Sequence, residues 1–131
     1  MTYKLIIDKN EITNLLNDYF FEVSGVRGLL PEALKYFGKK EGFGSGGKTI
    51  LFLNDLDESD EAYAVLKGDG KVLLSVDEAT SSADQDCEAY LTFQEFYDYL
   101  IKEVQKVSKE KPEQKQELES LMLDVKKGLN I

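Results

Sequence analysis

The residues that come closest to a known chemical motif form a glycine-rich run, Gly42-Phe43-Gly44-Ser45-Gly46-Gly47-Lys48-Thr49. This run matches the G-x-x-x-x-G-K-T pattern of the phosphate-binding P-loop. A P-loop leaves a strand and enters a helix, so that the N-terminal amides of the helix face the phosphates. Here the order is reversed, because the run follows a predicted helix and leads into strand-like residues. The sequence therefore favours a structural loop whose glycines allow tight turns with positive φ.

A second run, Asp55-Leu56-Asp57-Glu58-Ser59-Asp60-Glu61, spaces its acids as calcium ligands are spaced. An EF-hand loop needs glycine at its sixth position and a bidentate glutamate at its twelfth. Those positions hold Asp60 and Leu66 in this chain. The run does not predict a calcium site, and two interpretations remain: a solvated loop or a surface that binds a partner.

The side chains that most enzymes use near neutral pH are missing or rare. The sequence has no histidine, which is the commonest general acid or base in this range and the commonest metal ligand. Its single cysteine, Cys87, can form neither an internal disulfide nor a paired metal site. Carboxylate chemistry and Mg²⁺-dependent chemistry stay open. We nevertheless expect a protein that is not an enzyme, that needs no metal or cofactor and in which Cys87 is an inert thiol.

Acidic residues are concentrated in one segment. The chain carries 16 Lys and Arg against 25 Asp and Glu, a formal net charge of −9. Residues 54–88 hold eleven of these acids and two lysines, Lys67 and Lys71, so this segment accounts for the whole excess. Phosphates are bound by Lys and Arg, and direct binding of nucleic acid is therefore disfavoured. A basic protein surface is the natural complement.

The candidate partner-binding residues lie in two acidic stretches, residues 54–61 and 77–88. Tyrosine is a good interface anchor, and Tyr63 and Tyr90 flank these stretches. For each of these tyrosines, the sequence is equally consistent with packing in the core and with contact with a partner. The expected contacts are Asp55, Asp57, Glu58, Asp60, Glu61 and Tyr63, followed by Asp84, Asp86 and Glu88.

Apolar residues at helical spacing predict four helices that position these stretches. The first begins with a capping box at Asp8 and Glu11 and ends at Ser24-Gly25. A short helix runs from Pro31 to Gly38. The third begins at the capping box Thr92-Phe93-Gln94-Glu95, and the last begins at Pro112. The inward stripe of the third helix is predicted to be Phe93, Phe96, Tyr97, Leu100, Ile101, Val104 and Val107.

Charged residues on the third helix form mixed-sign pairs that we expect on its surface. These are Lys102, Lys106 and Lys109 with Glu95, Asp98 and Glu103.

Strand-like runs occupy the middle of the chain, at residues 49–53, 62–66, 71–76 and 89–91, and residues 3–7 form either a short strand or the lead into the first helix. Lys67-Gly68-Asp69-Gly70 between two of these runs indicates a hairpin. The acidic stretches would then lie on both sides of one hairpin. We predict a single α+β domain, residues 1–131, with a small antiparallel sheet of three to four strands packed with N-terminal and C-terminal helices.

The sequence also bears on location. No apolar run approaches the roughly 18–20 residues that cross a bilayer. The N-terminus reaches a charge too soon for a secretory signal. We expect a cytoplasmic protein.

The order of several motifs is shared with a known family. A helix ending in Tyr36-Phe37-Gly38 precedes Gly42-Phe43-Gly44-Ser45, a strand ending in Asn54-Asp55 and the acidic segment. A helix then opens with Leu91-Thr92-Phe93-Gln94-Glu95-Phe96-Tyr97-Asp98-Tyr99-Leu100, and a Lys- and Glu-rich tail follows Pro112. Over roughly residues 30–131 this order resembles the bacterial immunity proteins that neutralise ribonuclease toxins of contact-dependent growth inhibition systems. Residues 67–88 look like an insertion relative to that family.

The resemblance implies a cytoplasmic inhibitor that binds one cognate toxin domain, one-to-one, and has no catalytic residues. The charge agrees with this, because a ribonuclease must be basic to hold RNA and carboxylates can take the place of phosphates over its cleft. We therefore expect the acidic residues to bind a basic nuclease domain. The alternatives are a small nucleotide-binding protein that uses residues 42–49, and an acidic adaptor domain without a toxin partner.

Overall fold

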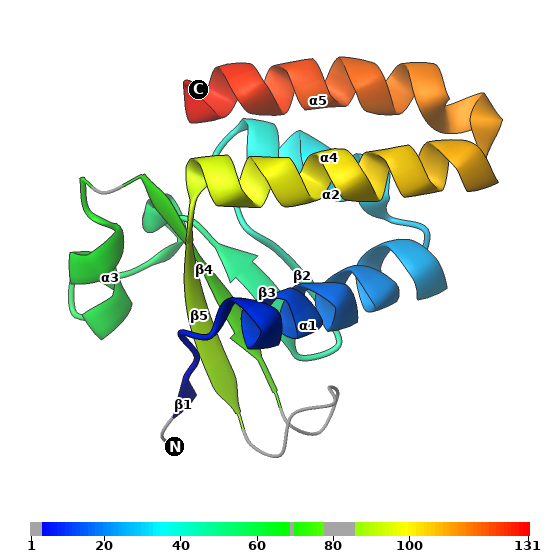
Figure 1. Ribbon diagram of the computed structural model, residues 1–131. Coiled ribbons are helices and arrows are strands. Elements are labelled where there is room, and N and C mark those ends of the chain that lie inside the picture. Colours follow the sequence, from blue (N-terminus) through cyan, green and yellow to red (C-terminus); the bar gives the residue numbers. More distant parts are fainter. Residues whose placement is uncertain (1–3, 69, 78–85) are drawn as a thin grey trace.

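The computed structural model describes residues 4–68, 70–77 and 86–131 (Figure 1). These residues form a five-stranded sheet with the order β1-β5-β4-β3-β2. Neighbouring strands run antiparallel except β1, which pairs in parallel with β5, so the sheet is mixed. The strands are β1 (Lys4–Leu5), β2 (Phe43–Ser45), β3 (Lys48–Leu51), β4 (Lys71–Val76) and β5 (Cys87–Thr92).

The long helices lie together on one side of the sheet, and the short helix α3 lies on the other (Figure 1). In the described chain, no helix combines the length and the apolar character needed to span a membrane. The helices are α1 (Lys9–Phe20), which continues as a π-helical turn (Phe21–Val26), α2 (Leu30–Gly38), α3 (Glu61–Leu66), α4 (Phe93–Glu110) and α5 (Lys115–Leu129), with 3₁₀ turns at Leu53–Asp55 and Pro112–Gln114.

The α+β class is confirmed, while the sheet is larger than predicted and contains a parallel pair. A two-residue strand such as β1 is too short to produce an alternating pattern, so its pairing with Cys87 and Glu88 is not readable from the sequence. Residues 67–88, which looked like an insertion, contain β4, and this strand pairs with both β3 and β5. Much of that segment is therefore integral to the sheet.

Two predicted helix starts, at Asp8 and at Thr92, are confirmed in their hydrogen bonds, whereas the last helix begins at Lys115, after a 3₁₀ turn at Pro112. The Glu11 amide donates to Asp8 Oδ2 at 3.1 Å, so Asp8 caps α1. At the start of α4 both halves of the capping box are present: the Glu95 amide donates to Thr92 Oγ1 at 3.1 Å and the Thr92 amide donates to Glu95 Oε1 at 2.9 Å. Thr92 also ends β5, so the strand passes into the helix without a loop.

The prediction of a strand at residues 62–66 is wrong, because these residues form α3. Ala62 and Leu66 are four residues apart and pack together against Leu73 of β4, as a helix allows. A short apolar run does not distinguish a strand from a helix by its periodicity. The hairpin predicted at residues 67–70 is absent as a consequence, since no strand precedes β4 there; Asp69 lies outside the described residues.

A hairpin forms instead at the glycine-rich run, which was expected to be a loop. Ser45 of β2 pairs with Lys48 of β3, and the two residues between them, Gly46 and Gly47, have φ of 60° and 80°. Two successive positive φ values are those of a type I′ turn. Lys48 is 4% exposed within β3. The run thus joins two strands, with its lysine buried, and lacks the helix that a phosphate-binding loop requires.

The two faces of the sheet have separate apolar clusters. Val72, Leu74 and Val76 of β4 point into the main core beneath the long helices. Leu73, which points the other way, belongs to a second, smaller cluster with Ala62 and Leu66 of α3. The fold is therefore strongly asymmetric, with most of its apolar packing on one side.

Two residues expected at particular places on α4 differ in the structure. Ile101, predicted on the inward stripe, is 36% exposed. Glu103, predicted on the surface, is only 7% exposed. Burial raises the pKa of the Glu103 carboxyl; Lys106 opposes this rise and Glu110 adds to it.

We predict that Glu103→Gln stabilises the fold at neutral pH. Because the folded protein binds the Glu103 proton more tightly than the unfolded chain does, this group lowers stability as pH rises above the ordinary glutamate pKa. The urea midpoint of the variant should exceed that of the parent at pH 7, and the gap should close toward pH 4. The exposed Glu117→Gln is the control and should show no such gap. A lower midpoint for Glu103→Gln at pH 7 would contradict the assignment.

Candidate partner-binding surface

Asp55, the first expected contact, is held by hydrogen bonds within the chain. Its Oδ2 accepts from the Gly42 amide and from the Phe52 amide, both at 2.8 Å. The carboxylate thus joins the connection between α2 and β2 to the turn that follows β3. Gly42 fits closely here, since a Cβ on it would lie 2.4 Å from the Ile50 carbonyl oxygen. The structure places Asp55 as a clamp at the start of the acidic stretch.

Asp57 and Asp60 shape the turn that leads into α3. Asp60 Oδ2 accepts from the Asp57 amide at 3.0 Å, and Asp57 Oδ1 accepts from the Ser59 amide at 3.3 Å. Asp60 occupies the N-cap position of α3. Both residues are exposed, so they hold the turn while their charges face solvent.

Glu61 and Glu88, one residue from each acidic stretch, interact electrostatically on the α3 side of the sheet. Glu61 lies in the first turn of α3 and Glu88 on β5. Partial burial raises the pKa of the Glu88 carboxyl, and the nearby Glu61 charge raises it further. The pKa of the Tyr90 phenol is raised by burial and then by both carboxylates. These side chains therefore share one electrostatic neighbourhood on the α3 side of the sheet.

The remaining predicted contacts differ in their accessibility. Glu58 is exposed and Tyr63 is half-buried. Asp86 is 7% exposed and its carbonyl accepts from the Lys4 amide at 2.8 Å, so it offers little surface to a partner. Asp84 lies outside the described residues.

Among the predicted acidic contacts, Glu58 and Glu61 are exposed and Glu88 is half-buried. Glu58, Glu61 and Glu88 form no salt bridge with any described residue. We name these three residues the acidic trio. In the described part of the chain no group of three or more acids, histidines or cysteines is arranged to hold a metal ion.

The sequence was also compared with known proteins. The family described as CDI immunity protein, where CDI is contact-dependent growth inhibition, matches residues 8–122. The chain belongs to this family. No curated protein and no solved structure matches it.

Membership extends over most of the fold, from the cap of α1 into α5. It confirms the resemblance found in the order of the motifs. This CDI immunity protein is not an enzyme, and its partner is a cognate CDI toxin. An adaptor without a toxin partner and a nucleotide-binding protein are therefore not supported.

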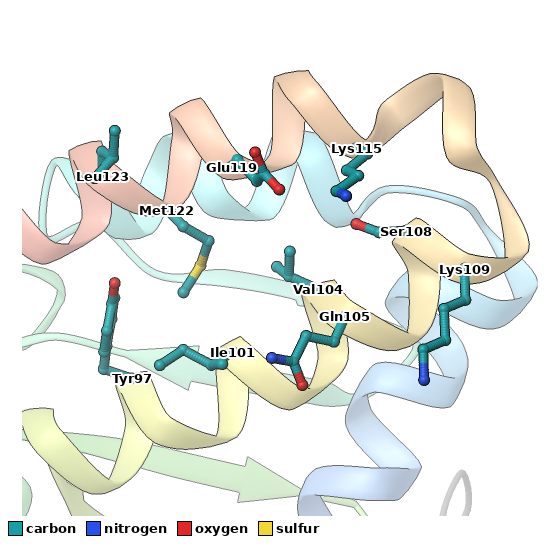
Figure 2. Close-up of a pocket in the computed structure, with 10 residues that line it drawn as sticks. All are labelled: Tyr97, Ile101, Val104, Gln105, Ser108, Lys109, Lys115, Glu119, Met122 and Leu123. Atoms are coloured by element: carbon teal, nitrogen blue, oxygen red, sulfur yellow. The ribbon is translucent and has the colours of Figure 1, made fainter.

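The immunity protein has a second surface feature that the sequence did not indicate. A groove of about 810 Å³ runs between α4 and α5 (Figure 2). Met122 points from α5 toward Ile101 of α4, and Lys109 and Lys115 lie at the other end. Leu123 at its edge is 68% exposed. These apolar positions follow the helical spacing of core residues, which is why the sequence does not distinguish them from the core.

We predict that Asp55 stabilises the fold of the immunity protein. Asp55→Ala removes the acceptor of two backbone amides and should lower the free energy of unfolding by about 1–2 kcal/mol, as loss of a capping side chain does. Asp55→Asn keeps one acceptor oxygen and should lose less. The measurement is urea denaturation, with Glu58→Ala as the matched exposed acid. Equal stability of Asp55→Ala and Glu58→Ala would contradict the clamp.

Proposed function

We propose that this immunity protein neutralises a basic ribonuclease toxin domain, one-to-one, by covering its RNA-binding cleft with the surface around the acidic trio. Tyr63 lies half-buried in the same helix as Glu61 and is the aromatic anchor of this surface. Asp57 and Asp60 add negative charge at its edge. Asp55 contributes by holding the stretch in place.

The electrostatic reasoning rests on what a ribonuclease needs. Its cleft must carry Lys or Arg to hold phosphates, and carboxylates presented at similar positions compete for the same cations. Complementary charge also accelerates association and rejects wrong partners. A toxin of this kind cleaves RNA in the cytoplasm, and the proposal therefore places the immunity protein there as well.

The observation that carries the proposal is the approach of Glu61 to Glu88. Partial burial raises the pKa of the Glu88 carboxyl, and the like charge of Glu61 raises it further. A Lys or Arg from a partner would relieve this repulsion on binding. Residues 54–88 hold the whole charge excess of the chain, and Glu61 of α3 and Glu88 of β5 lie on the α3 side of the sheet.

We predict that reversing the acidic trio weakens binding to the toxin. The variant Glu58→Lys/Glu61→Lys/Glu88→Lys should bind the toxin domain encoded directly upstream at least about a hundredfold more weakly at low salt, mainly through slower association. The difference should shrink as salt is added. Surface-bound toxin and a salt series measure both the rates and the affinity.

The matched control moves the same amount of charge elsewhere. Glu32→Lys/Glu113→Lys/Glu117→Lys changes three exposed acids outside residues 54–88. This control should keep most of the affinity. If both triple variants bind equally well, or lose affinity equally, the local acidic surface is wrong.

A further inference from the structure

The face of the sheet that carries α3 is covered only in part. α3 packs over the row formed by Leu51, Leu73 and Tyr90, which are direct partners across β3, β4 and β5. The next row on the same face consists of Thr49, Ser75 and Glu88. Paired residues point to the same face, and alternate residues along a strand share it. This second row therefore lies beside α3.

The second row continues to both edges of the sheet. Gly44 of β2 pairs with Thr49, and Leu5 of β1 pairs with Glu88. Gly44 and Leu5 are exposed, Leu5 at 55%, and the three central residues are half-buried. We name Leu5, Gly44, Thr49, Ser75 and Glu88 the sheet strip. It crosses all five strands, and none of its members is buried.

The strip is continuous with the acidic surface. Glu88 belongs to both, and Glu61 stands beside it at the start of α3. The other members of the strip are Thr49, Ser75, Gly44 and Leu5. Most of these side chains are small, so a partner's backbone can come close, and the two hydroxyls can exchange hydrogen bonds with it. The Glu88 carboxylate, next to the hydroxyl of Ser75, suits a Lys or Arg projecting from an extended segment.

We propose that the sheet strip is the floor on which an extended basic segment of the toxin domain docks, with a Lys or Arg paired to Glu88. This rests on the proposed function and deepens it, because it names the surface beneath the acidic trio. A second copy of this chain is the poorer occupant, since each copy carries a net charge of −9.

The test fills the centre of the strip without changing its charge. Ser75→Tyr should place an aromatic ring between Thr49 and Glu88, where it blocks the strip. Toxin binding should weaken at least a hundredfold, mainly through faster dissociation. Ser120→Tyr places the same ring at an exposed position on α5 and should bind as the parent does. Thermal unfolding of both variants checks that they are folded.

A second measurement avoids the bulky side chain. Ser75→Cys labelled with a photo-crosslinker should attach to the toxin, and Ser120→Cys should not; Cys87 is buried and stays unlabelled. Folded Ser75→Tyr with parental affinity, or equal crosslinking from both positions, overturns the strip. Loss of affinity in Ser75→Tyr but not in the charge-reversed trio supports docking on the strip, and it overturns both the electrostatic mechanism and the pairing of a cation with Glu88. Loss of affinity in the charge-reversed trio, together with parental affinity in folded Ser75→Tyr, overturns the strip alone.

Discussion

Two backbone amides from separate parts of the chain, those of Gly42 and Phe52, donate to one carboxylate oxygen of Asp55. Phe52 is buried in the main core, whereas Leu53 packs with the second cluster on the opposite face of the sheet. Asp55 therefore sits where the chain crosses from one face to the other. The position of α3, and with it the positions of Glu58 and Glu61, depends on this crossing.

The negative charges of Glu61 and Glu88 repel each other in the folded protein. Glu61 and Glu88 are brought close by the packing of α3 on the sheet, and neither finds a cation among the described residues. Such an arrangement lowers the stability of the free protein, and under the proposed function the cations of a basic partner relieve the repulsion on binding. It is tolerated because the main core lies on the other side of the sheet and is independent of these charges.

The sequence predicted well whatever depends on local hydrogen bonding and on long apolar patterns. The caps at Asp8 and Thr92 are where their residue types indicated. Residues 62–66 were misassigned because five apolar residues suit a strand and a helix equally, and packing on Leu73 decides between them. The charge excess in residues 54–88 is a property of the sequence itself, and its role in binding stays a prediction. The sequence does not reveal that Asp55 accepts a hydrogen bond from the Gly42 amide, because the two residues are far apart in the chain and only the fold brings them together.

The parallel pairing of β1 with β5 has a consequence for how the chain is made. Lys4 and Cys87 are partners although more than eighty residues separate them, so this edge of the sheet closes only after β5 has left the ribosome. Contacts between such distant residues form slowly, because a long loop must be closed first. The strip that β1 completes therefore matures later than surfaces made by neighbouring segments, such as the hairpin of β2 and β3.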